Sequence, residues 1–200
     1  MIPRSHRVRF ACAVGALLAA LALCACGAAA PAVMTEGERL TGRTLFPLGE
    51  GYQWTYDVDG NAGPPGRTTT RVVSHSGNRW HVDDGSGTEP VVYELRPEGV
   101  FRMYGQTWLL HEPIRVGETW SSPLGGLASV MDIHASAETP AGTFSDCVTV
   151  LETGTEGEIR SVYCPNVGLV TRATTTQGPQ GRVQETLRLH DRVPGPSSTR

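Results

Sequence analysis

Apolar and polar residues alternate with a period of two along much of the chain. In 52–58 the even positions are aromatic or aliphatic and the odd positions are polar, and 131–137 alternates in the same way with apolar residues at odd positions. A period of two indicates β-strands with one buried face. Further strands are expected at 68–74, 79–82, 91–95, 100–104, 107–110, 167–174 and 182–189.

Turn-forming clusters separate these segments and argue against helices. The chain contains 24 Gly and 14 Pro residues, many of them in short runs such as DVDGNAGPPG, HSGN and DDGSG. Such clusters between alternating segments are typical of antiparallel sheets. No stretch after the first 33 residues has the pattern of a long amphipathic helix, so the predicted class is mainly β and antiparallel.

Two segments 66 residues apart repeat one pattern. PLGEGYQW (47–54) and PIRVGETW (113–120) share Pro, an aliphatic residue, Gly and Trp at the same spacing. Gly provides a turn with positive φ, and Trp begins a strand with its ring inward. The pattern is either a coincidence of turn and strand chemistry or marks two equivalent strand starts on a single curved sheet.

The N-terminus has the pattern of an export signal. Three Arg residues in 1–9 precede an uncharged Ala- and Leu-rich run at 10–23, which is a basic region followed by an apolar region of secretory length. The run ends in LALCACG, which resembles the box where bacterial lipoproteins receive a diacylglycerol on a cysteine and are cleaved before it. Cys26 fits as the acceptor, because Cys24 would place the bulky Leu23 at the cut.

Two alternatives to lipidation stay open. One is an ordinary signal peptide cut near 28–30, and the other is an uncleaved membrane anchor. The expected organisation is a signal peptide at 1–25, a lipidated N-terminus and tether at 26–43, a β domain at 44–192 and a disordered tail at 193–200. Gly27 is not the aspartate linked with inner-membrane retention, so we expect an outer membrane lipoprotein facing the periplasm if the source has two membranes, and otherwise the cell membrane.

Charge excludes one class of partner. After removal of the signal, 14 basic residues, all Arg, face 20 acidic ones, a net charge of about −6. A surface with a net negative charge does not attract nucleic acid, which is itself negatively charged. The expected partners are the membrane, through the lipid at Cys26, and an envelope protein or a hydrophobic ligand.

Two cysteines flank a predicted hairpin. In DCVTVLETGTEGEIRSVYC a turn centred on residues 155 and 156 places Cys147 opposite Cys164 and Val148 opposite Tyr163. Opposed residues of an antiparallel pair lie within the range that a disulfide bridges, and an exported compartment preserves the bond. The alternatives are two buried thiols or, with less support, a metal pair.

Several motifs together resemble a large set of mostly uncharacterised bacterial secreted proteins and lipoproteins. The motifs are FPLGEGYQWTY (46–56), PIRVGETW (113–120), PAGTFSDCVTV (140–150) and VYCPNVGLVTR (162–172). The resemblance spans about 44–175, with departures at Tyr52, Gln53 and Asn166. It implies a strongly curved antiparallel sheet or open half-barrel, similar to the proteins that carry lipoproteins across the periplasm, and it implies no catalytic residue.

Motifs for catalysis and cofactor binding are missing from the sequence. There is no GxSxG, HExxH, phosphate loop or dinucleotide fingerprint, and the His residues lack ligand spacing. We therefore expect no catalytic residue, no cofactor and no metal. The remaining feature is a set of aromatic residues at strand positions expected to point inward. They form either a packed core or an open apolar groove, and they are Trp54, Tyr56, Trp80, Tyr93, Phe101, Trp108 and Trp120.

The functional hypotheses follow from these alternatives. The leading one is a lipid-anchored envelope lipoprotein with a noncatalytic β domain that binds or scaffolds. The second is a periplasmic carrier or receptor for a hydrophobic ligand such as an acyl chain or a lipoprotein, which requires the aromatic face to be open. An enzyme is the third.

Overall fold

A computed structural model of the chain describes residues 40–61, 63–178 and 181–195. The signal peptide, Cys26, most of the tether and the last five residues lie outside these ranges. The described part contains a short helix, α1 (Gly42–Leu45), and twelve strands. The strands are β1 (Gln53–Gly60), β2 (Gly66–Ser76), β3 (Arg79–Asp83), β4 (Val91–Arg96), β5 (Gly99–Arg102), β6 (Thr107–His111), β7 (Thr119–Ser121), β8 (Leu127–Thr139), β9 (Gly142–Gly154), β10 (Gly157–Cys164), β11 (Gly168–Gly178) and β12 (Gly181–Val193).

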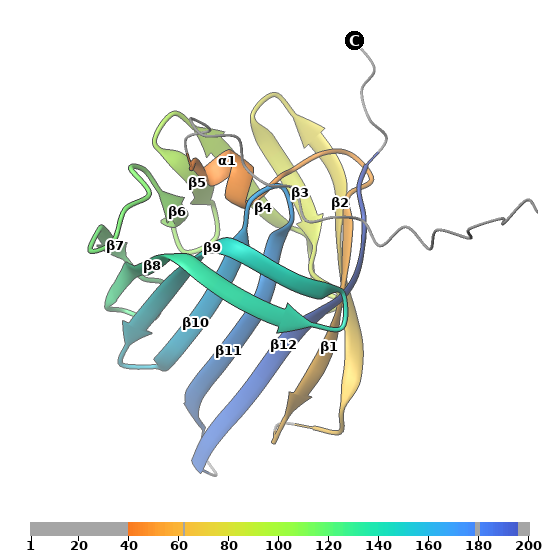
Figure 1. The fold of residues 1–200 in the computed structure, drawn as a ribbon, viewed down its shortest axis with the longest axis vertical. Helices are drawn as coiled ribbons and strands as arrows, with labels where there is room; N and C mark the ends of the chain where they lie inside the picture. The colour runs from red at the N-terminus through yellow and green to blue at the C-terminus, as the bar shows by residue number, and fades with distance from the viewer. Residues whose placement is uncertain (1–39, 62, 179–180, 196–200) are drawn as a thin grey trace, which may run out of the picture. The chain divides into compact units, whose positions relative to one another are not determined.

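All twelve strands form a single antiparallel sheet that curves until its two edges meet, so the predicted class and architecture are confirmed (Figure 1). The order is β6-β5-β4-β3-β2-β1-β12-β11-β10-β9-β8-β7. Side chains bridge the two edges: the Thr107 hydroxyl donates to the Ser121 carbonyl, and the Trp120 indole N–H donates to the Trp108 carbonyl at 2.9 Å. The seam between β6 and β7 is thus held by side-chain-to-backbone hydrogen bonds.

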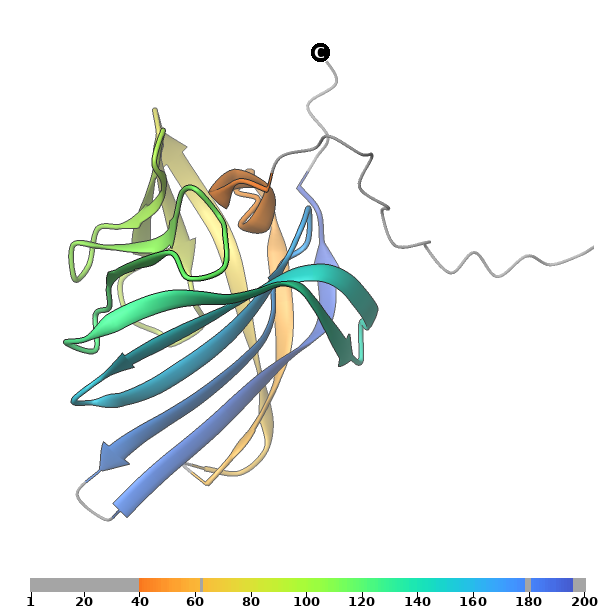
Figure 2. The same cartoon turned by 60° about the vertical axis from the view of Figure 1, so that its left-hand side comes forward.

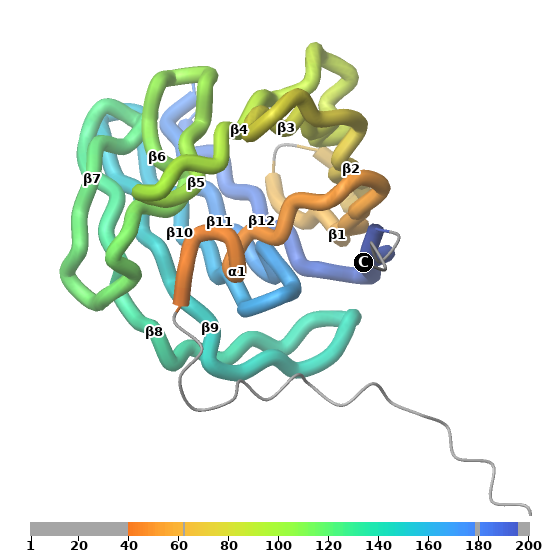
Figure 3. Tube along the Cα trace, turned by 90° about the horizontal axis from the view of Figure 1, so that it is seen from above, coloured from red at the N-terminus to blue at the C-terminus, as the bar shows by residue number. Residues whose placement is uncertain are grey.

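The curved sheet surrounds α1 (Figure 3). Leu45 is fully buried and Phe46 packs against Trp54 and Tyr93, with ring centroids 6.2 and 5.1 Å apart. Strands β10, β11, β12 and β1 reach farther down than the short strands β3–β6 (Figures 1 and 2). The helix therefore fills the upper interior, and the lower inner face of the long strands lacks an equally long strand opposite it.

The folded part begins earlier and ends later than the predicted range 44–192. Thr41 caps α1 through a capping box with Thr44, and the Gly42 N–H donates to a Glu112 carboxylate oxygen at 3.1 Å. A Cβ at Gly42 would lie 3.2 Å from Val100, so glycine permits this close approach. A four-residue helix is too short to show helical periodicity, which is why the segment resembled a tether. At the other end β12 extends to Val193.

The cysteine hairpin has the predicted register. Strands β9 and β10 meet at Gly154 and Gly157, and Val148 lies opposite Tyr163. Cys147 and Cys164 are joined by a disulfide with Cα atoms 4.2 Å apart. The turn residues and the alternation fixed this register, because a slip of one residue would move every side chain to the other face.

The repeated segments are equivalent strand starts. Gly51 and Gly117 both have positive φ, at 77° and 85°. Trp54 in β1 and Trp120 in β7 are both buried, and each donates its indole N–H to a carbonyl. The shared pattern therefore has the same physical cause in both copies.

The prediction of which residues of β8 face inward is wrong in part. In β8 the apolar odd positions were expected to face inward, but Met131 is 47% exposed and Val130 is 1% exposed. The pairing with β9 shifts register three times between Val130 and Ala137, where the pair is irregular. Each added residue in such an irregularity changes which positions face inward, and Ala137 is again buried.

Candidate functional site

Three of the predicted aromatic residues come together around an interior cavity. Trp54, Tyr56 and Tyr93 line a space of about 380 Å³ on the inner face of the sheet. Trp54 and Tyr56 are nearly fully buried and donate hydrogen bonds to the carbonyls of Val167 (2.6 Å) and Leu169 (3.1 Å). Part of the aromatic face is thus core, and part bounds an open space.

Trp80 and Trp120 lie elsewhere. Trp80 is opposite Tyr93 in the β3–β4 pair, and its ring stacks on His75 with centroids 4.5 Å apart. It is partly buried against the core but does not line the cavity. Trp120 is buried at the seam.

Phe101 and Trp108 are on the outer face, so the prediction that they point inward is wrong. Phe101 is directly opposite Glu94, whose neighbour Tyr93 faces the interior. The guanidinium of Arg96 lies 3.7 Å from the Phe101 ring centroid, a cation–π contact, and the Trp108 ring meets Phe101 edge-on at 5.1 Å. The pairing of β5 with β6 shifts register at this point, which changes the inward positions.

The inward positions of β5 are Val100 and Arg102. Val100 is fully buried, and Arg102 reaches across the interior to Glu152 of β9, with nitrogen and oxygen 3.6 Å apart. The Glu152 side chain is 4% exposed. Its second carboxylate oxygen and the hydroxyl of nearby Ser161 have no hydrogen-bond partner among the described residues. The interior therefore contains a buried ion pair together with polar groups that have no partner among the described residues.

A second arginine lies on the wall of the cavity. Arg172 of β11 is directly opposite Ser161 in the β10–β11 pair and lines the cavity with Tyr56 and Tyr93. Its Nε atom is buried and has no hydrogen-bond partner among the described residues, and the same holds for the hydroxyl of Tyr163. Within those residues no carboxylate forms an ion pair with Arg172, in contrast to Arg102.

The phenols of Tyr56 and Tyr93 are neutral. Burial raises the pKa of Tyr93 and, by a larger shift, that of Tyr56. Burial acts to lower the pKa of Arg172, but the phenols of the three surrounding tyrosines, Tyr163 first, together raise it above its usual value. The guanidinium therefore keeps its positive charge inside the sheet.

The inward direction of Arg172 was missed because of a bulge. Tyr163 is opposite Leu169 and Val162 is opposite Thr171, so Val170 is the extra residue in β11. Leu169 lines the cavity. If the strand alternated regularly after Leu169, the side chain of Arg172 would lie on the outer face of the sheet. The extra residue, Val170, shifts the alternation by one position and turns Arg172 inward. A single sequence carries no clear signal for this bulge.

Gly168, the first residue of β11, lies against the ring of Trp54. Its φ is +100°, and a Cβ there would approach the Trp54 indole nitrogen to 3.1 Å. The indole N–H reaches the Val167 carbonyl next to it. Glycine thus permits the contact that orients a wall residue of the cavity.

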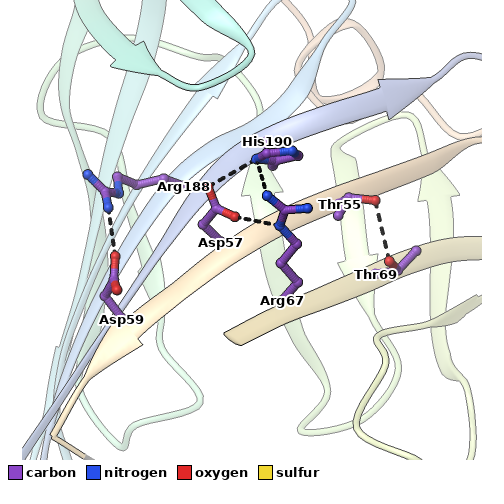
Figure 4. Close-up of polar contacts among 7 residues, drawn as sticks. All are labelled: Thr55, Asp57, Asp59, Arg67, Thr69, Arg188 and His190. Atoms are coloured by element: carbon purple, nitrogen blue, oxygen red, sulfur yellow. Dashed lines mark hydrogen bonds and ion pairs between the residues drawn. The ribbon is translucent and has the colours of Figure 1, made fainter. Parts of the chain in front are cut away.

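A separate polar network lies on the outer face of β1, β2 and β12 (Figure 4). Asp57 accepts from Arg67 at 2.9 Å and contacts His190 at 3.1 Å, and Arg188 pairs with Asp59 at 2.6 Å. The Arg67 hydrogen bond lowers the pKa of Asp57, with His190 adding to the effect. These are exposed ion pairs on polar strand positions, where such contacts contribute little.

The described residues were searched for a metal site and for a membrane-spanning helix. Among them, no group of three or more His, Cys, Asp or Glu side chains is placed to hold a metal ion. In the same ranges, no helix is both long and apolar enough to cross a bilayer.

Comparisons with known proteins find similarity to solved structures alone. No family model matches the chain, and no curated relative does. Two solved structures are similar: a candidate lipoprotein from Parabacteroides distasonis ATCC 8503 and a candidate exported protein with a YmcC-like fold from Bacteroides fragilis NCTC 9343. Both are 15% identical; they cover 75% and 74% of this chain and 98% of their own, with TM-scores of 0.43 and 0.45. Likeness at this level does not inform function.

Proposed function

We propose that the protein is a cell-envelope lipoprotein, anchored through Cys26, whose β domain is a noncatalytic module that binds a small ligand inside the curved sheet. The observation that carries this proposal is the interior cavity of about 380 Å³, lined by Trp54, Tyr56 and Tyr93 together with Arg172. Binding sites are commonly cavities of roughly 300 to 1,000 Å³ with apolar walls and a few convergent polar groups. A scaffold that acts through its exterior does not need such an interior.

The volume limits the ligand. At roughly 30 Å³ per water-sized group, the cavity accommodates about a dozen non-hydrogen atoms. A small molecule or one short chain fits, whereas the several long acyl chains of a lipoprotein do not. The size therefore favours a receptor for a small ligand over a carrier of lipoproteins.

The anchor rests on the sequence. The basic region, the apolar run and the LALCACG box support lipidation of Cys26, and two or more acyl chains hold a protein stably on a bilayer. The resemblance to bacterial secreted proteins and lipoproteins supports the same assignment. Gly27 favours the outer membrane, facing the periplasm, if the source has two membranes.

The proposed binding function of the cavity is tested by measuring whether a small molecule remains bound to the purified protein. The full chain, produced in its host and extracted under gentle conditions, is analysed by native mass spectrometry. Thr70→Trp fills the cavity from the inner face of β2, and Thr69→Trp places the same ring on the outer face as a matched control. We expect a bound small molecule in wild type and Thr69→Trp but not in Thr70→Trp. A wild-type chain without bound mass, or equal loading of both variants, overturns the proposal.

The anchor is tested separately. Cys26→Ser is expected to move the protein from the membrane fraction to the soluble fraction, and the wild type should carry the mass of a diacylglyceryl group on residue 26. Equal sedimentation of the variant with membranes, or an N-terminus at residue 28 or beyond, contradicts the anchor and leaves the cavity proposal standing.

A further inference from the structure

Two inward-facing arginines of the described strands, Arg102 and Arg172, have different surroundings. Arg102 is 3.6 Å from the buried carboxylate of Glu152. Arg172 has no carboxylate within 4 Å among the described residues, and its Nε is buried without a partner. Arg172 as a whole is partly buried, and a partly desolvated charge without a counter-charge is unfavourable. Among the described residues, the guanidinium of Arg172 therefore lacks an anionic partner.

Arg172 brings several hydrogen-bond donors to the wall of the cavity. A guanidinium has five N–H donors and no acceptor. The Tyr163 hydroxyl, in a residue that is 1% exposed, lies close to Arg172 and raises its pKa through a side-chain interaction, but neither this hydroxyl nor the Arg172 Nε has a partner at full hydrogen-bond geometry among the described residues. The Tyr56 hydroxyl is already committed to the Leu169 carbonyl. A ligand here must supply acceptors, and an anion supplies the charge as well.

The rest of the wall divides into an apolar and an acidic part. Leu169 and Leu187 flank the position of Arg172 on β11 and β12, and Val58 extends the apolar wall along β1. Asp84 and Glu185 also line the cavity, but neither is within ion-pair distance of the guanidinium. These carboxylates repel an anion from their part of the wall, so the acidic end of a ligand is directed toward Arg172.

We propose that the cavity binds a small amphiphilic anion, with a carboxylate or phosphate at Arg172, whose guanidinium lies beside the buried Tyr163 hydroxyl, and a short apolar body against Leu169, Leu187 and Val58. This inference deepens the proposed function, because it names the ligand class of the same cavity. A head group that accepts from the guanidinium supplies the missing counter-charge. The head group and the apolar body together fit the cavity, which has space for about a dozen non-hydrogen atoms.

The experiment compares probes of equal chain length. Decanoate, decyl phosphate and 1-decanol are titrated by calorimetry into the full chain in which Cys26→Ser removes the lipid. We expect decanoate or decyl phosphate to bind about 10- to 100-fold more tightly than 1-decanol, the range for hydrogen bonds to a charged group. The tighter of the two anions identifies whether the natural head group is a carboxylate or a phosphate.

Three variants locate the anion. Arg172→Met should remove the preference for the anions while 1-decanol still binds, and Tyr163→Phe should reduce the preference severalfold. Arg160→Met is the matched control, since Arg160 is exposed and opposite Ala173, the neighbour of Arg172 that faces outward. Thermal unfolding of each variant confirms a folded domain, and Tyr163→Phe provides an independent readout if Arg172→Met does not fold.

The outcomes separate the two proposals. Binding of 1-decanol as tight as that of the anions, or an anion preference that survives in both Arg172→Met and Tyr163→Phe, overturns the anion site and leaves a cavity that binds neutral ligands. No binding of any probe overturns the anion site, and it also overturns the proposed function if wild-type protein from its host carries no small molecule.

Discussion

The contact between Gly168 and Trp54 allows a quantitative test of the fold around the cavity. Gly168→Ala introduces a Cβ at a φ of +100°, 3.1 Å from the indole nitrogen that donates to the Val167 carbonyl. A non-glycine residue at positive φ costs about 1 to 3 kcal/mol. Displacing the indole weakens a buried hydrogen bond, which adds about 1 kcal/mol. The expected loss in the free energy of unfolding is therefore about 3 kcal/mol.

Gly142→Ala is the matched control. Gly142 also has positive φ, at 130°, but a Cβ there would meet nothing within 4 Å. This variant should lose only the backbone part, about 1 kcal/mol less than Gly168→Ala. Both are measured by urea denaturation, and by thermal unfolding, where each kcal/mol corresponds to about 2 to 4 °C for a domain of this size.

A double-mutant cycle isolates the contact. Trp54→Phe removes the indole N–H that the methyl group introduced by Gly168→Ala would displace, so the added cost of Gly168→Ala should disappear in that background. We expect a coupling of about 1 kcal/mol between the two positions. Equal losses for Gly168→Ala and Gly142→Ala, together with strictly additive effects in the double variant, would refute the proposed close contact.

Three further outcomes follow from other parts of the structure. Replacing both Cys147 and Cys164 by Ala should lower the free energy of unfolding by about 3 kcal/mol, since the disulfide closes a loop with a sequence separation of 17; an unchanged urea midpoint contradicts this. Glu152→Ala leaves its buried arginine partner without a counter-charge and should cost about 3 kcal/mol, whereas a cost below about 1 kcal/mol would show that the pair is not buried. Arg67→Gln should raise the pKa of Asp57 toward its usual value in an NMR titration. In the wild type, the Asp57 pKa is lower in the folded than in the unfolded state, so ionised Asp57 stabilises the fold at pH values above the unfolded pKa. This stabilisation is lost as the pH falls through the folded pKa. An unchanged pKa in the variant counts against the Arg67 hydrogen bond.

Local patterns were sufficient to predict most strands and the best-defined hairpin. The alternation at 52–58 places Trp54 and Tyr56 inward, as the structure has them, because β1 pairs regularly with β2. The register of the Cys147–Cys164 hairpin follows from a short turn and a regular ladder. Where the ladder is regular, the sequence determines which face each residue occupies.

The errors have a common physical cause. Irregular pairing in β8, at the β5–β6 pair and at Val170 changes which positions face inward. Simple alternation therefore placed Phe101 and Trp108 inside and gave no reason to place Arg172 there. An added residue in a strand depends on tertiary packing around it and has little sequence signature. The polar character of the interior was consequently not predictable from the alternation alone.

The most direct test of the ligand cavity is residue-resolved NMR of the 15N-labelled Cys26→Ser chain during titration with decanoate. We predict that the largest amide shifts cluster on the inner face, at Tyr93, Leu169 and Arg172, while His190 and Met131 on the outer side change little. Shifts confined to the outer residues, or no saturable shifts with any probe of this length, would contradict a binding site inside the sheet.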